Sequence, residues 1–443
     1  MNVLVICVDT LRWDHVGYAK QFPVSTPNID RLAQRATIFE RAYIGSFPTN
    51  PMRTDSITGN CNFPRYDWKA LGDEEIILSE VLNEAGYYTS LIVDHGPMKG
   101  LNRGFQEFYV THNPPDDAPE SEDIPFLVPK EHIRQEGKQR QQQMADLAHC
   151  KYDSEFWVGT SMTKAAEWLQ DNYKRDKWFL WVDTFEPHEV WHTPHYYVDL
   201  YDPNYKGLDY DFPCYDYSKD IYSKKQLKHM RAHYAASVTM TDRWIGHLFT
   251  QMDVMQLWDT TTVVLIADHG TYIGEHKRAG KHPINREDPW PLYEEVAHIP
   301  LLVYSPRKDM KKRVKALAQP SDVMPTLLDA CCVKGPNMHG KSLLPLMNGK
   351  KRRNFDVAFS SKHGSYKTRR GVGATYLTAT SEKWSYIAAE PGHRPELYDL
   401  KTDPKQKRNL AKQHPGVCKK MQDSVVGFLR QEGAEPDYVA RFE

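Results

Sequence analysis

Thr49 and Arg53 stand four positions apart, with Pro51 between them, and this arrangement could support ester chemistry. Pro51 suits the first turn of a helix, which would direct backbone amides and the positive end of the helix dipole toward an anion near Thr49. Arg53 would lie one turn away and could bind both Thr49 and a substrate oxygen. A threonine hydroxyl is a weak nucleophile, so it needs a metal ion or a neighbouring base. The alternative is a helix-capping threonine beside an ordinary surface arginine.

A second group of reactive side chains follows two apolar runs. Asp9 comes directly after one run, and Asp268 and His269 come directly after another. If these runs are strands of one sheet, two carboxylates and an imidazole could meet around a cation. Oxygen-rich ligands with one imidazole suit Ca²⁺, Mg²⁺ or Mn²⁺, and Zn²⁺ is a further option. The alternative is that the aspartate and the histidine only satisfy a hydrogen bond in the core.

The elements that would position these residues alternate between strand-like runs and helical patterns. The mostly β-branched run at residues 3–8 predicts a strand covered on both faces. Similar apolar runs lie at 91–93, 179–182, 263–266 and 301–304, and helical patterns lie at 76–85, 162–173 and 235–252. This alternation predicts an α/β fold with a mostly parallel central sheet and helices on both faces.

Polar residues stand at or just after the ends of these predicted strands. They are Asp9, Asp94, His95, Asp183, Asp268 and His269. Parallel strands end at a common edge, which is where ligands of such folds bind. We therefore expect these side chains to converge at that edge.

Two stretches interrupt the α/β pattern. Residues 112–150 change from Pro- and acid-rich to Gln- and Lys-rich, which predicts a surface insertion. Residues 196–222 interleave tyrosines with aspartates, and loops of this length are usually either functional lids or disordered. After about residue 350 the helical periodicity weakens and short strands appear. We therefore predict a catalytic domain at 1–350 and a smaller α+β subdomain at 351–443, with a short antiparallel sheet and a closing helix near 417–431.

Composition narrows the classes of partner and location. The 443 residues carry 57 Lys+Arg against 58 Asp+Glu, so no overall field favours nucleic acid or an anionic membrane as a partner. The 7 cysteines are odd in number and lack C-x-x-C spacing, so we expect reduced thiols. The apolar start of the chain is too short for a signal peptide or a membrane span. These observations predict a cytoplasmic protein.

Ordered sequence blocks recur along nearly the whole chain. They include D-T-L-R from residue 9, T-N-P-M-R-x4-T-G from 49, A-D-H-G from 267, G-K-H from 280, Y-E-E from 293 and E-L-Y-D-L from 396. Together these blocks resemble the sulfatase branch of the alkaline phosphatase superfamily. The pairs Asp9-Thr10 and Asp268-His269 are more similar to its phosphonate monoester hydrolase and phosphodiesterase members.

This resemblance implies an alkaline phosphatase-like fold and a set of site residues. A divalent metal ion would be bound by Asp9, Thr49, Asp268 and His269. Thr49 would take the nucleophile position, with Arg53 supporting it. The residues that would contact the anion or protonate the departing oxygen are His95, His188 and Lys281, with His282 beside them. One metal site is favoured, although a second ion could be held by Asp183, Glu186, His188, His192 and His282.

Two positions depart from the family pattern. Val93 or Asp94 stands where the family has a lysine, which removes a positive charge from the anion pocket. Thr49 stands where the family has a cysteine or serine that is oxidised to formylglycine, and threonine cannot form that aldehyde. A threonine ester must instead be attacked by water, which is easier at phosphorus than at sulfur once a cation neutralises the oxygens.

We therefore expect a metal-dependent hydrolase of a small anionic ester that uses Thr49 as its nucleophile. The expected substrate is a phosphate ester, a phosphodiester or a phosphonate monoester. One alternative is a sulfuric ester hydrolase, and another is an inactive relative that only binds an anion. Because C-terminal extensions of this branch often mediate assembly, the resemblance also implies a homo-oligomer.

Overall fold

The computed structural model describes most of the chain. The described residues are 1–65, 70–95, 100–133, 137–219, 221–283, 290–307, 310, 312–362, 377–391 and 393–443. Residues 134–136 and 220 of the two predicted insertions, and residues 363–376 of the predicted C-terminal subdomain, lie outside this part of the chain.

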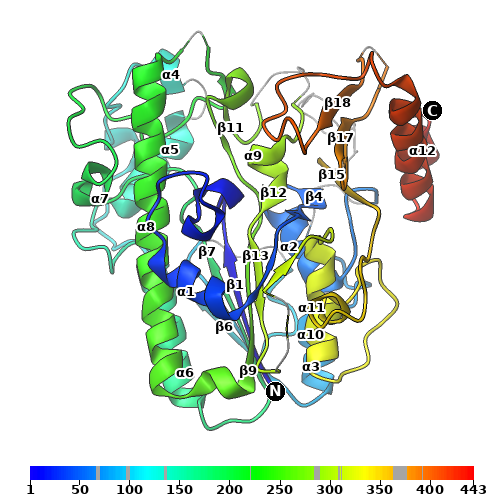
Figure 1. Cartoon of the computed structure of the whole chain (residues 1–443). Coiled ribbons are helices and arrows are strands. Elements are labelled where there is room, and N and C mark those ends of the chain that lie inside the picture. The colour runs from blue at the N-terminus through cyan, green and yellow to red at the C-terminus, as the bar shows by residue number, and fades with distance from the viewer. Residues whose placement is uncertain are drawn as a thin grey trace.

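A mostly parallel sheet forms the centre of the molecule (Figure 1). Within the described residues it has eight strands, in the order β14-β2-β13-β9-β1-β7-β5-β6. Their bounds are β1 Asn2–Val8, β2 Thr37–Phe39, β5 Tyr88–Val93, β6 Glu107–Val110, β7 Trp178–Thr184, β9 Thr261–Ala267, β13 Leu301–Tyr304 and β14 Arg313–Val314. Strands β9, β1, β7, β5 and β6 run parallel, whereas β13 is antiparallel to both of its neighbours. The predicted α/β fold is confirmed.

The three middle strands β9, β1 and β7 are apolar because both faces of the sheet are covered. Every residue of these strands is buried. Their register pairs Cys7 with Asp183 and Val8 with Ala267, so the strands end almost level. Asp9, Asp183 and Asp268 consequently emerge at one edge of the sheet, as the sequence predicts.

Helices cover both faces of this sheet (Figure 1). One face carries α1 Pro27–Arg35, α6 Trp157–Asn172 and α8 Lys224–Val254. The other carries α2 Thr49–Thr58, α3 Leu78–Glu84 and α10 Val323–Ala330. A capping box between Ser223 and Gln226 fixes the start of α8. The shorter helices are α4 Lys130–Ile133, α5 Gly137–Leu147, α7 His195–Asp199, α9 Glu294–Ala297, α11 Leu344–Met347 and α13 Pro436–Val439.

Two small sheets lie beside the carboxyl edge of the central sheet. One joins β10 Tyr272–Ile273, β11 Arg278–Gly280 and β8 Asp216–Tyr217, and the other joins β12 His298–Ile299 to β3 Ala42–Tyr43. Strand β8 belongs to the Tyr-rich stretch predicted as an insertion, so this stretch is ordered against the chain that leads to Lys281. None of the described helices combines the length and the apolar character needed to cross a bilayer.

The C-terminal region forms a mainly antiparallel sheet with a helix against it (Figure 1). Its strands are β15 Val357–Lys362, β16 Thr378–Ser381, β17 Trp384–Ile387 and β18 Glu396–Asp399, and the helix is α12 Pro415–Gln431. The predicted antiparallel sheet and closing helix are confirmed. The sequence did not predict a fifth strand of this sheet, β4 Ser46–Phe47, which pairs with β15. Strand β4 ends two residues before Thr49.

Candidate active site

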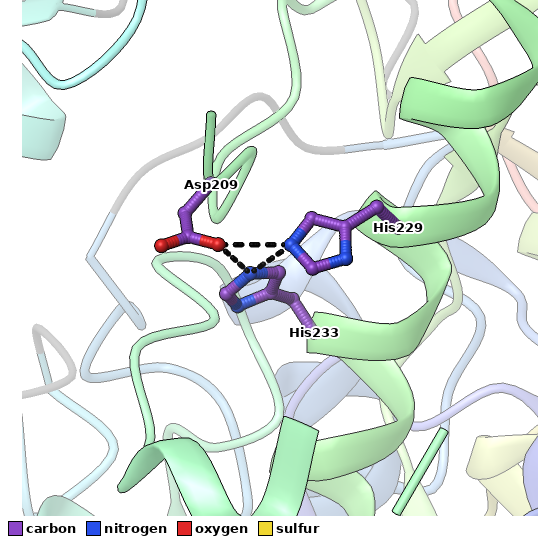
Figure 2. Close-up of side chains that lie close together, drawn as sticks. All are labelled: Asp209, His229 and His233. Carbon is purple, nitrogen blue, oxygen red and sulfur yellow. Dashed lines mark hydrogen bonds and ion pairs between the residues drawn. The ribbon is translucent and has the colours of Figure 1, made fainter. Parts of the chain in front are cut away.

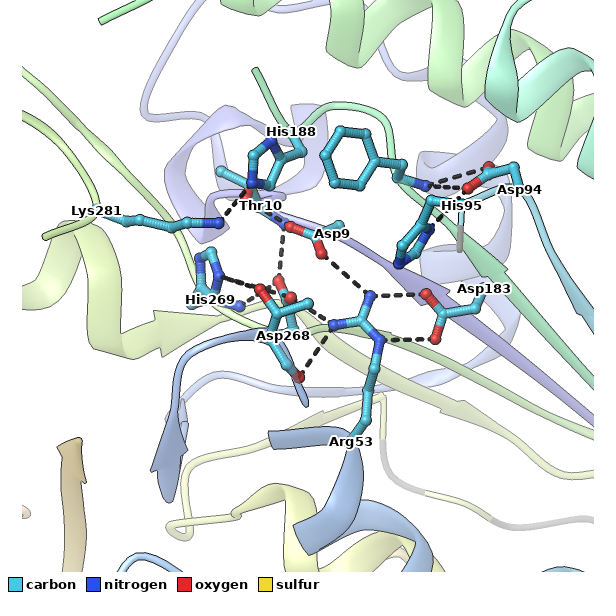
Figure 3. A network of polar contacts seen from close by, with 12 residues as sticks. Asp9, Thr10, Arg53, Asp94, His95, Asp183, His188, Asp268, His269 and Lys281 are labelled. Carbon is cyan, nitrogen blue, oxygen red and sulfur yellow. Dashed lines mark hydrogen bonds and ion pairs between the residues drawn. The ribbon is translucent and has the colours of Figure 1, made fainter. Parts of the chain in front are cut away.

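Four buried charged side chains meet where β9, β1 and β7 end (Figure 3). Arg53, on α2, makes a bidentate pair with Asp183 at 2.8 and 2.6 Å. The same guanidinium lies 2.6 Å from Asp268 and 3.2 Å from Asp9. Burial disfavours its charge, but the carboxylates, led by Asp183, raise the pKa of Arg53 well above its usual value. The interpretation of Arg53 as an ordinary surface arginine is therefore wrong.

Asp9, Asp268 and His269 form a group that could hold a metal ion. One ligand atom from each lies within 4.8 Å of the others, and all three residues are buried. Burial lowers the pKa of His269 to about 3, so its ring is neutral, and its Nδ1 contacts the carbonyl oxygen of Gly270 at 3.0 Å. Its Nε2 lies 3.6 Å from Asp268 Oδ2, which is too long for the hydrogen bond of the alternative interpretation. Two carboxylates and one neutral imidazole fit a divalent cation.

Thr49 is the first residue of α2, and its hydroxyl lies beside this group. Its Oγ1 is 3.3 Å from His269 Nε2, and its carbonyl oxygen accepts a hydrogen bond from Arg53 Nη1 at 3.1 Å. The cap position of the helix belongs to Pro48, so Thr49 is not the capping residue of the alternative interpretation. The structure thus brings Thr49, Arg53, Asp268 and His269 together, as predicted.

Thr10 orients both aspartates from a strained backbone. Its φ is 59°, in the left-handed region, which costs a β-branched residue about 1–3 kcal/mol. Its amide donates to Asp268 at 2.8 Å and its hydroxyl donates to Asp9 at 2.7 Å. Tyr234 on α8 donates its hydroxyl to the carbonyl oxygen of Thr10 at 2.8 Å. Sequence reasoning missed Tyr234, since a tyrosine inside a helical pattern carries no signal of such a role.

Lys281 and His188 form the cationic side of the site (Figure 3). Lys281 Nζ lies 2.5 Å from His188 Nε2, and His188 Nδ1 lies 2.5 Å from the carbonyl oxygen of Glu189. Burial and the charge of Lys281 lower the pKa of His188 well below its usual value. The ring is therefore neutral: its Nδ1–H donates to the carbonyl and its Nε2 accepts from the ammonium group. His188 is arranged to hold Lys281 in place.

His95 and Asp94 form a second pair at the end of β5. His95 Nδ1 lies 3.0 Å from Asp94 Oδ1, and Asp94 also accepts a hydrogen bond from the backbone amide of Phe185 at 2.9 Å. Burial disfavours the charged ring, but the hydrogen bond to Asp94, its charge and that of Asp183 outweigh burial and raise the pKa of His95. Asp94, one of the two residues that could stand at the family's lysine position, thus stabilises the protonated form of His95.

The residues predicted to hold a second metal ion are not brought together. Asp183 is paired with Arg53, and Glu186 accepts a hydrogen bond from the amide of Val158 at 2.5 Å. His192 lies against Phe156, and burial lowers the pKa of His282 to about 3. Within the described residues these side chains form no group with metal-ligand spacing. The only group there besides that of Asp9 consists of Asp209, His229 and His233, which the sequence analysis did not identify.

The chain is similar to known proteins in family, in sequence and in structure. A family model described as "Sulfatase" matches residues 1–332, and one described as "N-sulphoglucosamine sulphohydrolase, C-terminal" matches residues 288–431. Arylsulfatase K of Rattus norvegicus is 26% identical over 454 residues, which cover 94% of this chain and 76% of that protein.

Two solved structures resemble the fold over almost its whole length. Phosphonate monoester hydrolase of Agrobacterium radiobacter superposes with a TM-score of 0.75 at 20% identity and covers 97% of this chain and 96% of its own. A protein solved in complex with its substrate D-glucosamine-2-N,6-O-disulfate superposes with a TM-score of 0.74 at 16% identity and covers 99% of both chains.

Proposed function

Because this chain belongs to the sulfatase family, we propose that it is a hydrolase of small sulfuric esters, with a sulfated sugar as the substrate class. The relatives named arylsulfatase K and the neighbour solved with a disulfated glucosamine support sulfur over phosphorus. They favour a sulfuric ester hydrolase, the alternative named above, over the phosphorus ester hydrolase that the sequence led us to expect first. The observation that carries the proposal is the convergence of Thr49, Arg53 and the group Asp9, Asp268 and His269 at one sheet edge.

In the proposed reaction the Thr49 hydroxyl loses its proton to solvent and its oxygen attacks the ester sulfur, while the bond from sulfur to the departing oxygen breaks. Asp9, Asp268 and His269, with the Thr49 hydroxyl beside them, would hold the cation, for which Ca²⁺, Mg²⁺, Mn²⁺ and Zn²⁺ are the candidates. When bound, the cation would lower the pKa of that hydroxyl and neutralise charge on the ester oxygens.

The other side chains would position the reacting groups and move one proton. Arg53 fixes the start of α2 through the Thr49 carbonyl oxygen, and the buried ammonium group of Lys281 faces the developing negative charge. His95 would give its proton to the departing oxygen as the bond between that oxygen and sulfur breaks. Water then hydrolyses the threonine ester and releases sulfate.

A second candidate function is hydrolysis of a phosphate ester, a phosphodiester or a phosphonate monoester. Thr49 favours it, since no aldehyde can form at this position and a phosphoryl-threonine is more readily hydrolysed than a sulfuryl-threonine. The fold similarity to a phosphonate monoester hydrolase is consistent with this chemistry.

The two candidates are separated by measuring kcat/KM for matched aryl esters. Aryl sulfate, aryl phosphate, aryl phosphate diester and aryl phosphonate would each be assayed with Ca²⁺, Mg²⁺, Mn²⁺ and Zn²⁺. We expect the sulfate to have the highest kcat/KM. A higher value for a phosphorus ester would replace the first candidate with the second. Tight, metal-dependent anion binding without turnover of any ester would identify an inactive relative.

The pair of His95 and Asp94 predicts a change in the pH profile. A general acid must be protonated, so activity should fall as pH rises through the pKa of His95. Asp94→Asn removes the negative charge that raises the pKa of His95, whereas burial, which lowers this pKa, remains. The alkaline limb of the pH profile of kcat should therefore move to lower pH. His95→Gln should lower kcat by about 10²- to 10⁴-fold for substrates with poor leaving groups. A limb that stays in place in Asp94→Asn would show that another group is the acid.

A further inference from the structure

Two histidines of α8 and one aspartate from the Tyr-rich stretch converge in a group that shares no residue with the candidate active site (Figure 2). His229 and His233 are one helical turn apart, so both rings project from the same side of the helix. Their Nε2 atoms lie 3.2 Å from each other. Asp209 Oδ1 lies 2.9 Å from His229 Nε2 and 3.4 Å from His233 Nε2.

The outer ring nitrogens of both histidines face hydrogen-bond acceptors. His229 Nδ1 lies 3.3 Å from the carboxylate of Asp202, and His233 Nδ1 lies 3.3 Å from the carbonyl oxygen of Trp191. A carbonyl or carboxylate oxygen can only accept, so each Nδ1 is placed to donate an N–H outward, away from Asp209. With the protons on Nδ1, both Nε2 atoms are free to turn their lone pairs toward an ion, and Asp209 Oδ1 is the third atom facing it. Such outer hydrogen bonds are the usual way in which metal-binding histidines are oriented.

At this spacing the Asp209 oxygen and the two Nε2 atoms need either a shared proton or a cation between them. Bond lengths of about 2.0–2.1 Å at tetrahedral angles place the ligand atoms of zinc roughly 3.3 Å apart. The separations of 2.9, 3.2 and 3.4 Å lie close to that value. Both rings are almost fully buried, whereas the Asp209 side chain is 41% exposed, so water can reach the remaining tetrahedral position.

We propose that Asp209, His229 and His233 bind a divalent transition-metal ion of the zinc class. Two imidazoles among three ligands favour Zn²⁺ over Ca²⁺ or Mg²⁺, which prefer oxygen. This proposal does not depend on the reaction or on the metal ion proposed for the candidate active site.

The bound ion would fasten the Tyr-rich stretch to α8. Two residues after Asp209, the carbonyl oxygen of Asp211 accepts a hydrogen bond from the amide of Trp191 at 2.7 Å. Farther along, Tyr215 lies edge-on to His282 with ring centroids 5.7 Å apart, and β8 pairs with β11 directly before Lys281. The ion would therefore stabilise the wall that carries Lys281 and His282, as a structural site.

The test is a count of bound metal in the full-length protein and its variants. Protein stripped with a chelator would be reloaded with Zn²⁺, passed through a desalting column and analysed for zinc by mass spectrometry. Asp209→Asn and His233→Ala should each lose about one equivalent of zinc relative to wild type. His247→Ala, a third histidine on α8 that contacts Trp244, serves as the matched control and should lose none.

Reloading with Co²⁺ gives a second measurement that does not depend on activity. Tetrahedral Co²⁺ absorbs visible light strongly, so wild type and His247→Ala should show a band that Asp209→Asn lacks. The partly exposed carboxylate makes Asp209→Asn a mild change, and circular dichroism would verify its fold. Equal zinc content and equal Co²⁺ spectra in wild type and Asp209→Asn would overturn the proposal. The close approach of the two rings would then be explained by a proton shared between them. Loss of ester hydrolysis alone would test only the proposed function.

Discussion

Replacing Thr49 with alanine is expected to lower kcat by on the order of 10⁴- to 10⁶-fold, the range seen when a catalytic nucleophile is removed. The hydroxyl of Thr49 lies 3.3 Å from His269 Nε2, and no other hydroxyl in the proposed reaction can replace it. The fold should be unchanged because the substitution removes a half-buried hydroxyl and methyl group at the first turn of α2. Steady-state kinetics on the best ester of the substrate screen provides the measurement.

Thr54→Ala is the matched control for this variant. Thr54 is also half-buried on α2, but its hydroxyl donates to the carbonyl oxygen of Asn50 in its own helix at 3.0 Å, so kcat should hardly change. Thr49→Ser should retain turnover, because it keeps the hydroxyl. Thr49→Cys, co-expressed with an enzyme that forms formylglycine, would show whether the site also supports the aldehyde chemistry of the family. Full activity in Thr49→Ala would exclude a nucleophilic role for this residue.

Replacing Arg53 with methionine is expected to lower the free energy of unfolding by about 3–5 kcal/mol. The guanidinium is completely buried and pairs with three buried carboxylates, so its removal leaves their charges uncompensated. Urea unfolding followed by circular dichroism provides the measurement. Arg31→Met is the control, because Arg31 and its partner Asp253 are each 37% exposed and such a pair contributes about 0–1 kcal/mol. Equal losses in the two variants would contradict the expected importance of the buried cluster.

The loss in Arg53→Met should depend on pH. Burial and the charge of Asp9 raise the pKa of Asp268 above about 3.9, the value in an unfolded chain, and Arg53 opposes this shift, so loss of the guanidinium should raise that pKa further. A carboxyl group with a raised folded pKa stabilises the fold below the unfolded pKa and loses that contribution as pH rises through the folded pKa. The difference in stability between wild type and variant should therefore shrink as pH is lowered toward 4.

The sequence predicted the position of the site because a parallel sheet leaves little freedom in where its strands end. Asp9 and Asp268 follow two apolar runs that form neighbouring strands, so their side chains emerge side by side. Arg53 follows Thr49 by one helical turn, so the spacing of these two residues in the sequence places them together on α2. The left-handed backbone of Thr10 could not be predicted in this way, since its partners include Asp268 and Tyr234, both more than two hundred residues away. Chemical reasoning from Thr49 alone favoured phosphorus, whereas likeness over most of the chain favours sulfur.

The group on α8 was missed for a different reason. His229 and His233 have the spacing of helical metal ligands, which is a signal that the sequence contains. Their partner Asp209 lies among many tyrosines and aspartates, with nothing to distinguish it before the loop is placed. Only the fold shows which carboxylate faces the two rings.

The pairing of β4 with β15 has a consequence for when the segment leading to Thr49 is supported. Strand β4 ends two residues before Thr49, the first residue of α2, and its partner strand is made more than three hundred residues later. During synthesis on the ribosome, the hydrogen bonds of Ser46 to Asp55 can form early, whereas the pairing of β4 with β15 must wait until the last quarter of the polypeptide emerges. Loss of the chain from residue 357 onward would leave every residue of the candidate active site present but would remove the strand that supports the segment leading to Thr49.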